Sequence, residues 1–116
     1  MNASTSTIIA APDAPVVVLF GGSPIRRAEV LELIRGIGGV TAYGALREQE
    51  GLSLLATLPR VDLVLIGGRY GETERERIRA YVATRLPGTS LSEPGWAYPY
   101  DNDAIVADIR RKLRLD

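Results

Sequence analysis

The stretch VVVLFGGSP, residues 16–24, decides the fold of this 116-residue chain. It opens with a continuous apolar run, rich in β-branched residues, which is typical of a strand covered on both faces. The glycine pair Gly21-Gly22 ends that strand, and Ser23-Pro24 supplies an N-cap and a proline for the first position of a helix. The stretch therefore predicts a strand, a tight turn and a helix, the opening of a parallel α/β unit.

The helix that follows this turn ends near residues 36–39, where three glycines allow a left-handed C-cap. Its expected buried stripe, at helical spacing, consists of Ile25, Ala28, Leu31 and Ile34. Residues 40–43 predict a second strand. Residues 47–58 predict a second helix, which Pro59 stops.

The stretch VDLVLIGG, residues 61–68, predicts a third strand and ends in a second glycine pair. Thr73 and Glu76 form a capping-box pattern for a helix that runs to about residue 86. On its exposed face we expect three ion pairs at i,i+3 spacing: Glu72–Arg75, Glu74–Arg77 and Glu76–Arg79. A fourth strand at 89–92, an aromatic loop and a last helix to about residue 113, capped by Asp101 or Asn102, complete the chain.

Strands and helices thus alternate from residue 16 to the end. This order predicts a four-stranded parallel sheet, strand order 2-1-3-4, with helices on both faces, as in small flavodoxin-like or Rossmann-like three-layer sandwiches. We expect one α/β domain over residues 15–116, preceded by a mobile lead-in at 1–14. Residues 7–11 could form a short extra strand, although we assign them to the lead-in.

The composition excludes several chemistries. The chain has no cysteine and no histidine, so disulfides, thiolate nucleophiles, histidine acid–base catalysis and ordinary zinc sites are absent, and we expect no metal or cofactor. Fourteen basic residues balance fourteen acidic ones, so no overall field favours nucleic acid. No apolar run approaches the roughly 20 residues of a membrane span, and the opening lacks the pattern of a secretory signal. We therefore expect a cytoplasmic protein.

Two glycine turns mark the place where a ligand would bind. In sheets of this kind, ligands lie outside the carboxyl ends of the strands where the winding direction reverses, here between the first and third strands. Glycine leaves backbone amides accessible, and each turn precedes a helix N-terminus, which favours anions. The candidate ligand-binding residues are Gly21, Gly22, Ser23, Gly67, Gly68, Arg69 and Tyr70. The alternative is that these turns use glycine only for tight strand-to-helix connections.

A loop of unusual composition, EPGWAYPYD at residues 93–101, should overhang the same end of the sheet. Its aromatic residues Trp96, Tyr98 and Tyr100 suit a partner-binding patch or a stacking lid, or else a packed cover for the sheet edge. Glu93 is the one carboxylate expected to point into the crevice. With Arg69 and Tyr70 it could form an acid–base site.

The stretches VVVLFGGSPIRR (16–27) and VDLVLIGG (61–68) resemble the first and third strands of response-regulator receiver domains. The resemblance implies a flavodoxin-like fold and a signalling role. It places Gly21 and Gly22 where the family has metal-binding acids, Gly67 in place of the phosphoacceptor aspartate, and Ser92 at the switch hydroxyl. Aspartyl phosphorylation is therefore not carried over, and the resemblance is to a degenerate, pseudo-receiver type.

A second stretch, GGRYGETERE at residues 67–76, is similar to the GGxGTxxE motif of cytokinin-activating phosphoribohydrolases, with different spacing. Two hypotheses follow. The first is a non-catalytic, receiver-like module that binds a partner protein or a small anionic ligand; a homodimer is compatible with it. The alternative is a small enzyme that processes nucleotides or nucleosides with Arg69, Tyr70 and Glu93.

Overall fold

A central sheet organises the computed structural model, which describes residues 6–115. Its five strands are β1 (Ser6–Ile8), β2 (Val16–Phe20), β3 (Thr41–Ala45), β4 (Leu63–Ile66) and β5 (Ser90–Ser92). They lie in the order β1-β3-β2-β4-β5, and every neighbouring pair except β1–β3 is parallel. The predicted order 2-1-3-4 is thus confirmed for β2 to β5.

Strand β1 is an addition to the predicted sheet. It pairs antiparallel with the outer edge of β3, with Ser6 opposite Gly44 and Ile8 opposite Ala42. Beyond β1, the amide of Ala10 donates to the hydroxyl of Thr41 at 2.9 Å. Assigning residues 7–11 wholly to the lead-in was therefore wrong, because three residues suffice to pair with an edge that is already formed. Residues 1–5 of the lead-in lie outside the described residues, and its mobility stays a prediction.

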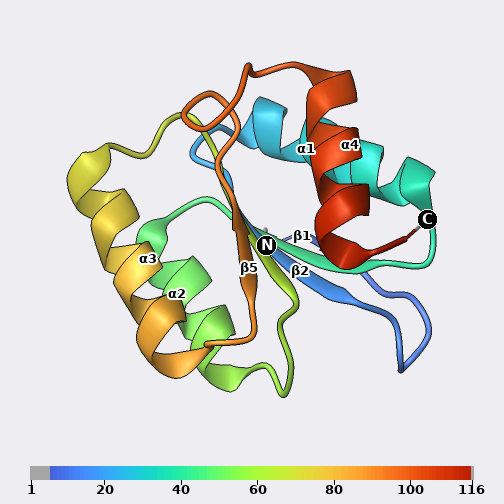
Figure 1. Ribbon diagram of the computed structural model, residues 1–116, viewed down its shortest axis with the longest axis horizontal. Coiled ribbons are helices and arrows are strands. Elements are labelled where there is room, and N and C mark those ends of the chain that lie inside the picture. Colours follow the sequence, from blue (N-terminus) through green and yellow to red (C-terminus); the bar gives the residue numbers. More distant parts are fainter. Residues whose placement is uncertain (1–5, 116) are drawn as a thin grey trace.

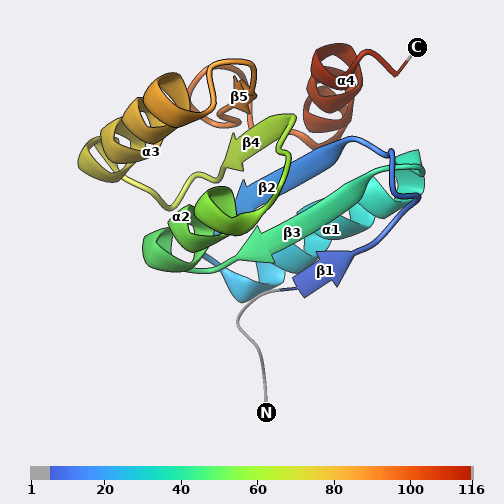
Figure 2. The same cartoon turned by 90° about the horizontal axis from the view of Figure 1, so that it is seen from below.

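Helices cover both faces of the sheet, which explains why the central strands are apolar on both sides (Figures 1 and 2). Helices α1 (Pro24–Ile37) and α4 (Asn102–Leu113) cover one face, and α2 (Glu48–Thr57) and α3 (Glu72–Arg85) cover the other. Val17 and Leu19 pack under α1 and α4, whereas Val18 and Phe20 pack under α2 and α3. Among the described residues no helix is long and apolar enough to cross a membrane.

The buried stripe of α1 differs from the predicted one. Ile25 is 74% exposed and Ala28 is also exposed, while Val30, Leu31 and Ile34 are buried. The reason is helical phase: Arg27 and Leu31 contact Gly44 of β3, so the face of α1 that packs on the sheet is the one that carries Leu31 and Ile34. Ile25 is nine residues from Ile34 and therefore lies on the opposite side of the helix.

Helix α3 also departs from the prediction at its start and along its charged face. Gly71, not Thr73, is the N-cap, and its amide donates to the Glu74 carboxylate at 2.7 Å. None of the three expected i,i+3 ion pairs forms. Each arginine instead reaches a neighbouring element: Arg75 and Arg79 bind Glu93, and Arg77 binds Glu48 of α2. Arg79 also binds Glu72, two turns back along α3. At α4, Asp101 is the N-cap.

Candidate functional site

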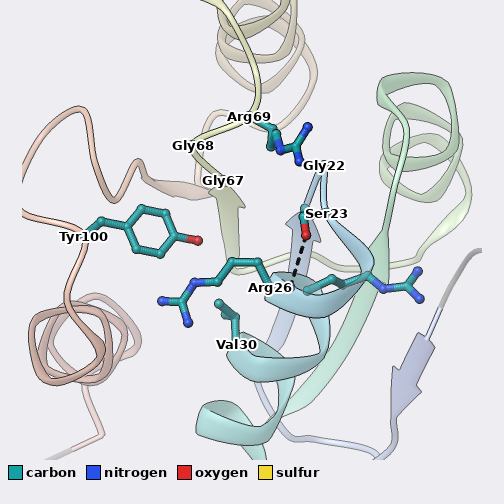
Figure 3. A pocket seen from close by; sticks show the side chains of 10 residues that line it. Gly22, Ser23, Arg26, Val30, Gly67, Gly68, Arg69 and Tyr100 are labelled. Carbon is teal, nitrogen blue, oxygen red and sulfur yellow. Dashed lines mark hydrogen bonds between the residues drawn. The ribbon is translucent and has the colours of Figure 1, made fainter.

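The two glycine turns lie side by side at the carboxyl ends of β2 and β4, as predicted. The amide of Gly67 donates to the carbonyl of Phe20 at 2.8 Å, and a Cβ added at Gly22 would lie 2.5 Å from the Cβ of Arg69. Glycine is needed at position 22 because the second turn approaches it so closely. Between the turns, α1 and the loop before α4 is a cavity of about 420 Å³ (Figure 3). Its lining residues are Gly21, Gly22, Ser23, Arg26, Arg27, Val30, Gly67, Gly68, Arg69 and Tyr100.

Residues of the two glycine turns, several of them with free backbone amides, line one side of this cavity. Within the described part of the chain, the amides of Gly22, Ser23, Gly68 and Arg69 donate no hydrogen bond. The carbonyl of Gly67 accepts from the buried guanidinium of Arg75 at 2.7 Å. Since the N–H and C=O of a trans peptide point in opposite directions, the amide of Gly68 points away from Arg75. Arg75 therefore fixes the orientation of one of these free donors.

Among residues 6–115, three arginines and no acidic residue line the cavity. Arg69 has no ion-pair partner among the described residues, and the aliphatic part of its side chain packs against Gly22. Arg27 buries its Nε and Nη1 atoms with no hydrogen-bond partner in the same part of the chain. Arg26 forms an ion pair with Glu29, and its guanidinium carbon lies 4.5 Å from the ring centre of Tyr100. The Arg27 side chain packs against Gly44 of β3, on the far side of β2 from β4, so its buried nitrogens do not face the cavity. Arg26 and Arg69 supply the positive charge that favours an anion there.

Arg26, Arg27 and Val30 were not among the predicted site residues. Their signal lay in the sequence, since the residues at the start of a helix capped by Ser23 lie next to the preceding glycine turn. The hydroxyl of Ser23 accepts from the amide of Arg26 at 3.4 Å, so Ser23 caps α1 as expected (Figure 3).

The three aromatic residues of the loop lie in three different environments. Tyr100 lines the cavity and contacts Gly68. Trp96 is 49% exposed and stacks on Arg75, with 4.2 Å between the guanidinium carbon and the ring centre. Tyr98 packs against the α1/α4 core, and its hydroxyl lies 2.8 Å from that of Ser92 and 3.3 Å from Asp108. Tyr98 therefore covers the sheet edge, as the alternative interpretation of this loop expected for a packed segment.

Glu93 and Tyr70 do not line the cavity with Arg69. Glu93 accepts hydrogen bonds from Arg75 and Arg79, each at 2.8 Å to Oε1. Burial alone would raise the pKa of Glu93, but the hydrogen bonds from Arg79 and Arg75 outweigh it and lower that pKa. Tyr70 is 5% exposed, and its hydroxyl donates to the carbonyl of Leu46 at 2.8 Å. The expected Arg69–Tyr70–Glu93 assembly is therefore not formed.

An alkaline titration tests the burial of two tyrosines. Burial raises the pKa of Tyr70 and of Tyr98 from 10.0 to about 12. The folded state thus keeps a proton that the unfolded chain releases near pH 10, so this contribution to stability is complete below about pH 10 and is lost as the pH rises through 12. We expect a late tyrosinate absorbance step near pH 12 that shrinks in Tyr70→Phe and in Tyr98→Phe. Titration of all tyrosines near pH 10 in the folded protein would contradict it.

The fold and the cavity together define a three-layer, receiver-like α/β domain. Its arginine-lined cavity lies between β2 and β4, where the winding direction of the sheet reverses. No protein-family model matches the chain. Two solved structures are similar to it. A response regulator from Thermotoga maritima aligns with a TM-score of 0.67 and 18% identity, over 87% of this chain and 98% of that one. The signal receiver domain of an HD domain-containing protein from Pseudomonas fluorescens Pf-5 aligns with a TM-score of 0.70 and 16% identity, over 88% and 96%. The predicted resemblance to receiver domains is thus confirmed for the fold.

Proposed function

We propose that this chain is a non-catalytic, receiver-like binding module that holds an anionic ligand against its two glycine turns. The observation that carries the proposal is the lining of the cavity, where turn residues with free amides meet Arg26 and Arg69, and no acidic residue of the described chain lies among them. Arginine and turn amides are the donors that suit phosphate and carboxylate groups. In the resemblance to receivers, Gly21, Gly22 and Gly67 stand where that family has acids, which supports binding without phosphoryl transfer.

The chemistry of the remaining groups supports a module without catalysis. Glu93 is held by two arginines and Tyr70 donates to a backbone carbonyl, so neither offers a free acid or base to a ligand in the cavity. The alternative, a nucleotide-processing enzyme, requires both residues at the ligand. Turnover of a nucleotide that Glu93→Gln abolishes with the fold intact would establish that alternative instead.

A signalling partner is part of the same proposal. The two similar structures are named as a response regulator and as the receiver domain of a larger protein. Trp96, about half exposed and stacked on Arg75, is the first candidate for a contact with a partner protein. A cytoplasmic location and a homodimer stay predictions.

Calorimetric titration with inorganic phosphate and with pyrophosphate tests the anion site. We expect both anions to bind and to raise the melting temperature progressively as their concentration increases above the Kd. Arg69→Gln should weaken binding about tenfold, because a hydrogen bond to a charged group contributes on the order of 1.5–3 kcal/mol. The matched control is Arg85→Gln, an exposed arginine at the far end of α3, which should bind as the unaltered protein does. Equal affinities for the two variants, or no binding of either anion, would overturn the proposal.

A further inference from the structure

We infer that the ligand of this cavity is a nucleotide, with its phosphate at the glycine turns and its base against Tyr100 and Arg26. The inference rests on the proposed function and names the chemical class of its ligand. Three properties of the cavity carry it: its size, the apolar surface that lies beside its polar groups, and the stacked pair that Arg26 and Tyr100 form.

The cavity is too large for a bare inorganic anion. Its volume is about 420 Å³. A phosphate ion occupies roughly the space of two or three water molecules at about 30 Å³ each, and so fills only about a fifth of it. Cavities of a few hundred cubic ångströms are the size in which proteins hold small organic ligands and cofactors. A phosphate bound at the turns therefore leaves room for a larger group attached to it.

The lining combines polar and apolar surface. Ser23 and Arg69 lie at the turns and Val30 lies on α1, while the ring of Tyr100 contacts Gly68 of the second turn (Figure 3). An anion alone would gain nothing from a valine side chain and a tyrosine ring. A phosphate ester with an apolar or aromatic portion would satisfy both kinds of surface at once.

Arg26 and Tyr100 form a flat surface suited to a heterocyclic base. The guanidinium of Arg26 lies over the ring of Tyr100 at 4.5 Å, and it is held by Glu29 and by the side-chain oxygen of Asn102 at 2.9 Å. Both remain accessible, with 37% of Tyr100 and 29% of the Arg26 side chain exposed. Nucleobases stack on aromatic rings and on arginine planes, whereas a sugar phosphate has no flat face to offer. The pair is thus ordered before a base arrives.

Binding of AMP, GMP, CMP and UMP, compared with ribose 5-phosphate, adenosine and inorganic phosphate, tests the inference by calorimetry on the full chain. We expect at least one nucleotide to bind tenfold or more tightly than ribose 5-phosphate, and adenosine to bind more weakly than AMP. Tyr100→Leu should weaken nucleotide binding about tenfold and leave ribose 5-phosphate binding unchanged. Arg69→Gln should weaken both. Tyr81→Leu, on α3 and outside the cavity, is the matched aromatic control and should change neither.

The outcomes separate this inference from the proposed function. If phosphate and ribose 5-phosphate bind but no nucleotide binds more tightly, the ligand class is wrong and the anion site stands. If inorganic phosphate, pyrophosphate and every nucleotide fail to bind, the anion site itself is wrong. Adenosine that binds as tightly as AMP, or a Tyr100→Leu variant that loses ribose 5-phosphate binding to the same extent as nucleotide binding, would also overturn the inference.

Discussion

Replacing Arg75 by methionine is expected to lower the free energy of unfolding by about 3–5 kcal/mol, the usual cost of removing one partner of a buried ion pair. The guanidinium of Arg75 is fully buried and donates to the carbonyls of Tyr70 and Gly67 and to Glu93, at 2.7–2.9 Å. Methionine fills much of the space but supplies no donor, so both carbonyls lose their partner. The midpoint of urea denaturation measures the loss.

The matched control is Arg77→Met, two residues along the same helix. Arg77 also forms two hydrogen bonds to a glutamate, at 2.6 and 2.7 Å to Glu48, but more than half of its side chain is exposed. Exposed ion pairs contribute little, so this variant should denature close to the unaltered protein. Similar midpoints for the two variants would contradict the conclusion that the hydrogen bonds of Arg75 stabilise the β4–α3 turn. Combining Arg75→Met with Glu93→Gln should cost less than the two changes added, because they share one interaction.

The same contacts make Arg75 a determinant of the cavity. It joins the β4–α3 turn, through Gly67 and Tyr70, to the start of the loop before α4, through Glu93. These are the two segments that contribute Gly68 and Tyr100 to the lining. Loss of Arg75 should therefore weaken anion binding even under conditions in which the variant stays folded.

The position of Arg75 also shows what the sequence could have revealed. It precedes Ile78 by three residues and Val82 by seven, and both of those residues are buried. Arg75 therefore lies on the apolar stripe of α3, while Arg77 and Arg79 do not. Assigning all three arginines to one exposed face followed charge spacing and overlooked the helical phase.

The parallel strands and their order were predictable because the local sequence patterns and the topology of a parallel sheet point to the same arrangement. Apolar runs that end in glycine pairs, separated by helix patterns with caps, leave few arrangements for a parallel sheet. Strand β1 was not predictable in this way, since its three residues become a strand only against the exposed edge of β3. Ile25 was misplaced because the predicted stripe had the wrong helical phase: Val30, Leu31 and Ile34 are buried, and Ile25 lies on the opposite side of α1 from Ile34.

Part of the candidate site was likewise predictable from the sequence and part was not. The adjacency of the glycine turns follows from topology and was predicted. The position of Glu93 depends on one further strand, because β5 lies beyond β4 and its carboxyl end meets α3 instead of the crevice. The spacing of Trp96, Tyr98 and Tyr100 suggests a shared face only if the loop is extended, and it is not: the amide of Gly95 donates to the carbonyl of Tyr98 at 2.7 Å.

A pair of glycine-to-alanine substitutions is expected to act in opposite directions. Gly51→Ala in α2 would place a Cβ 2.1 Å from Cε2 of Phe20, whose ring is fully buried and packs edge-on against Tyr70. Overpacking of this kind costs about 1–3 kcal/mol or more, against a gain in helix propensity of about 1 kcal/mol. A Cβ added at Gly36 in α1 has no atom within 4 Å, so Gly36→Ala gains helix propensity without any cost of overpacking. Thermal and urea denaturation should show Gly51→Ala less stable and Gly36→Ala more stable than the unaltered protein.

The consequence for the cavity distinguishes this packing argument from a general effect of helix stability. Phe20 is the last residue of β2, and its carbonyl accepts the hydrogen bond from Gly67 that holds the two glycine turns together. A displaced Phe20 ring should move that carbonyl, so Gly51→Ala is expected to weaken phosphate binding while Gly36→Ala leaves it unchanged. If Gly51→Ala proves as stable as Gly36→Ala, the ring of Phe20 does not occupy the space against α2 that determines both effects.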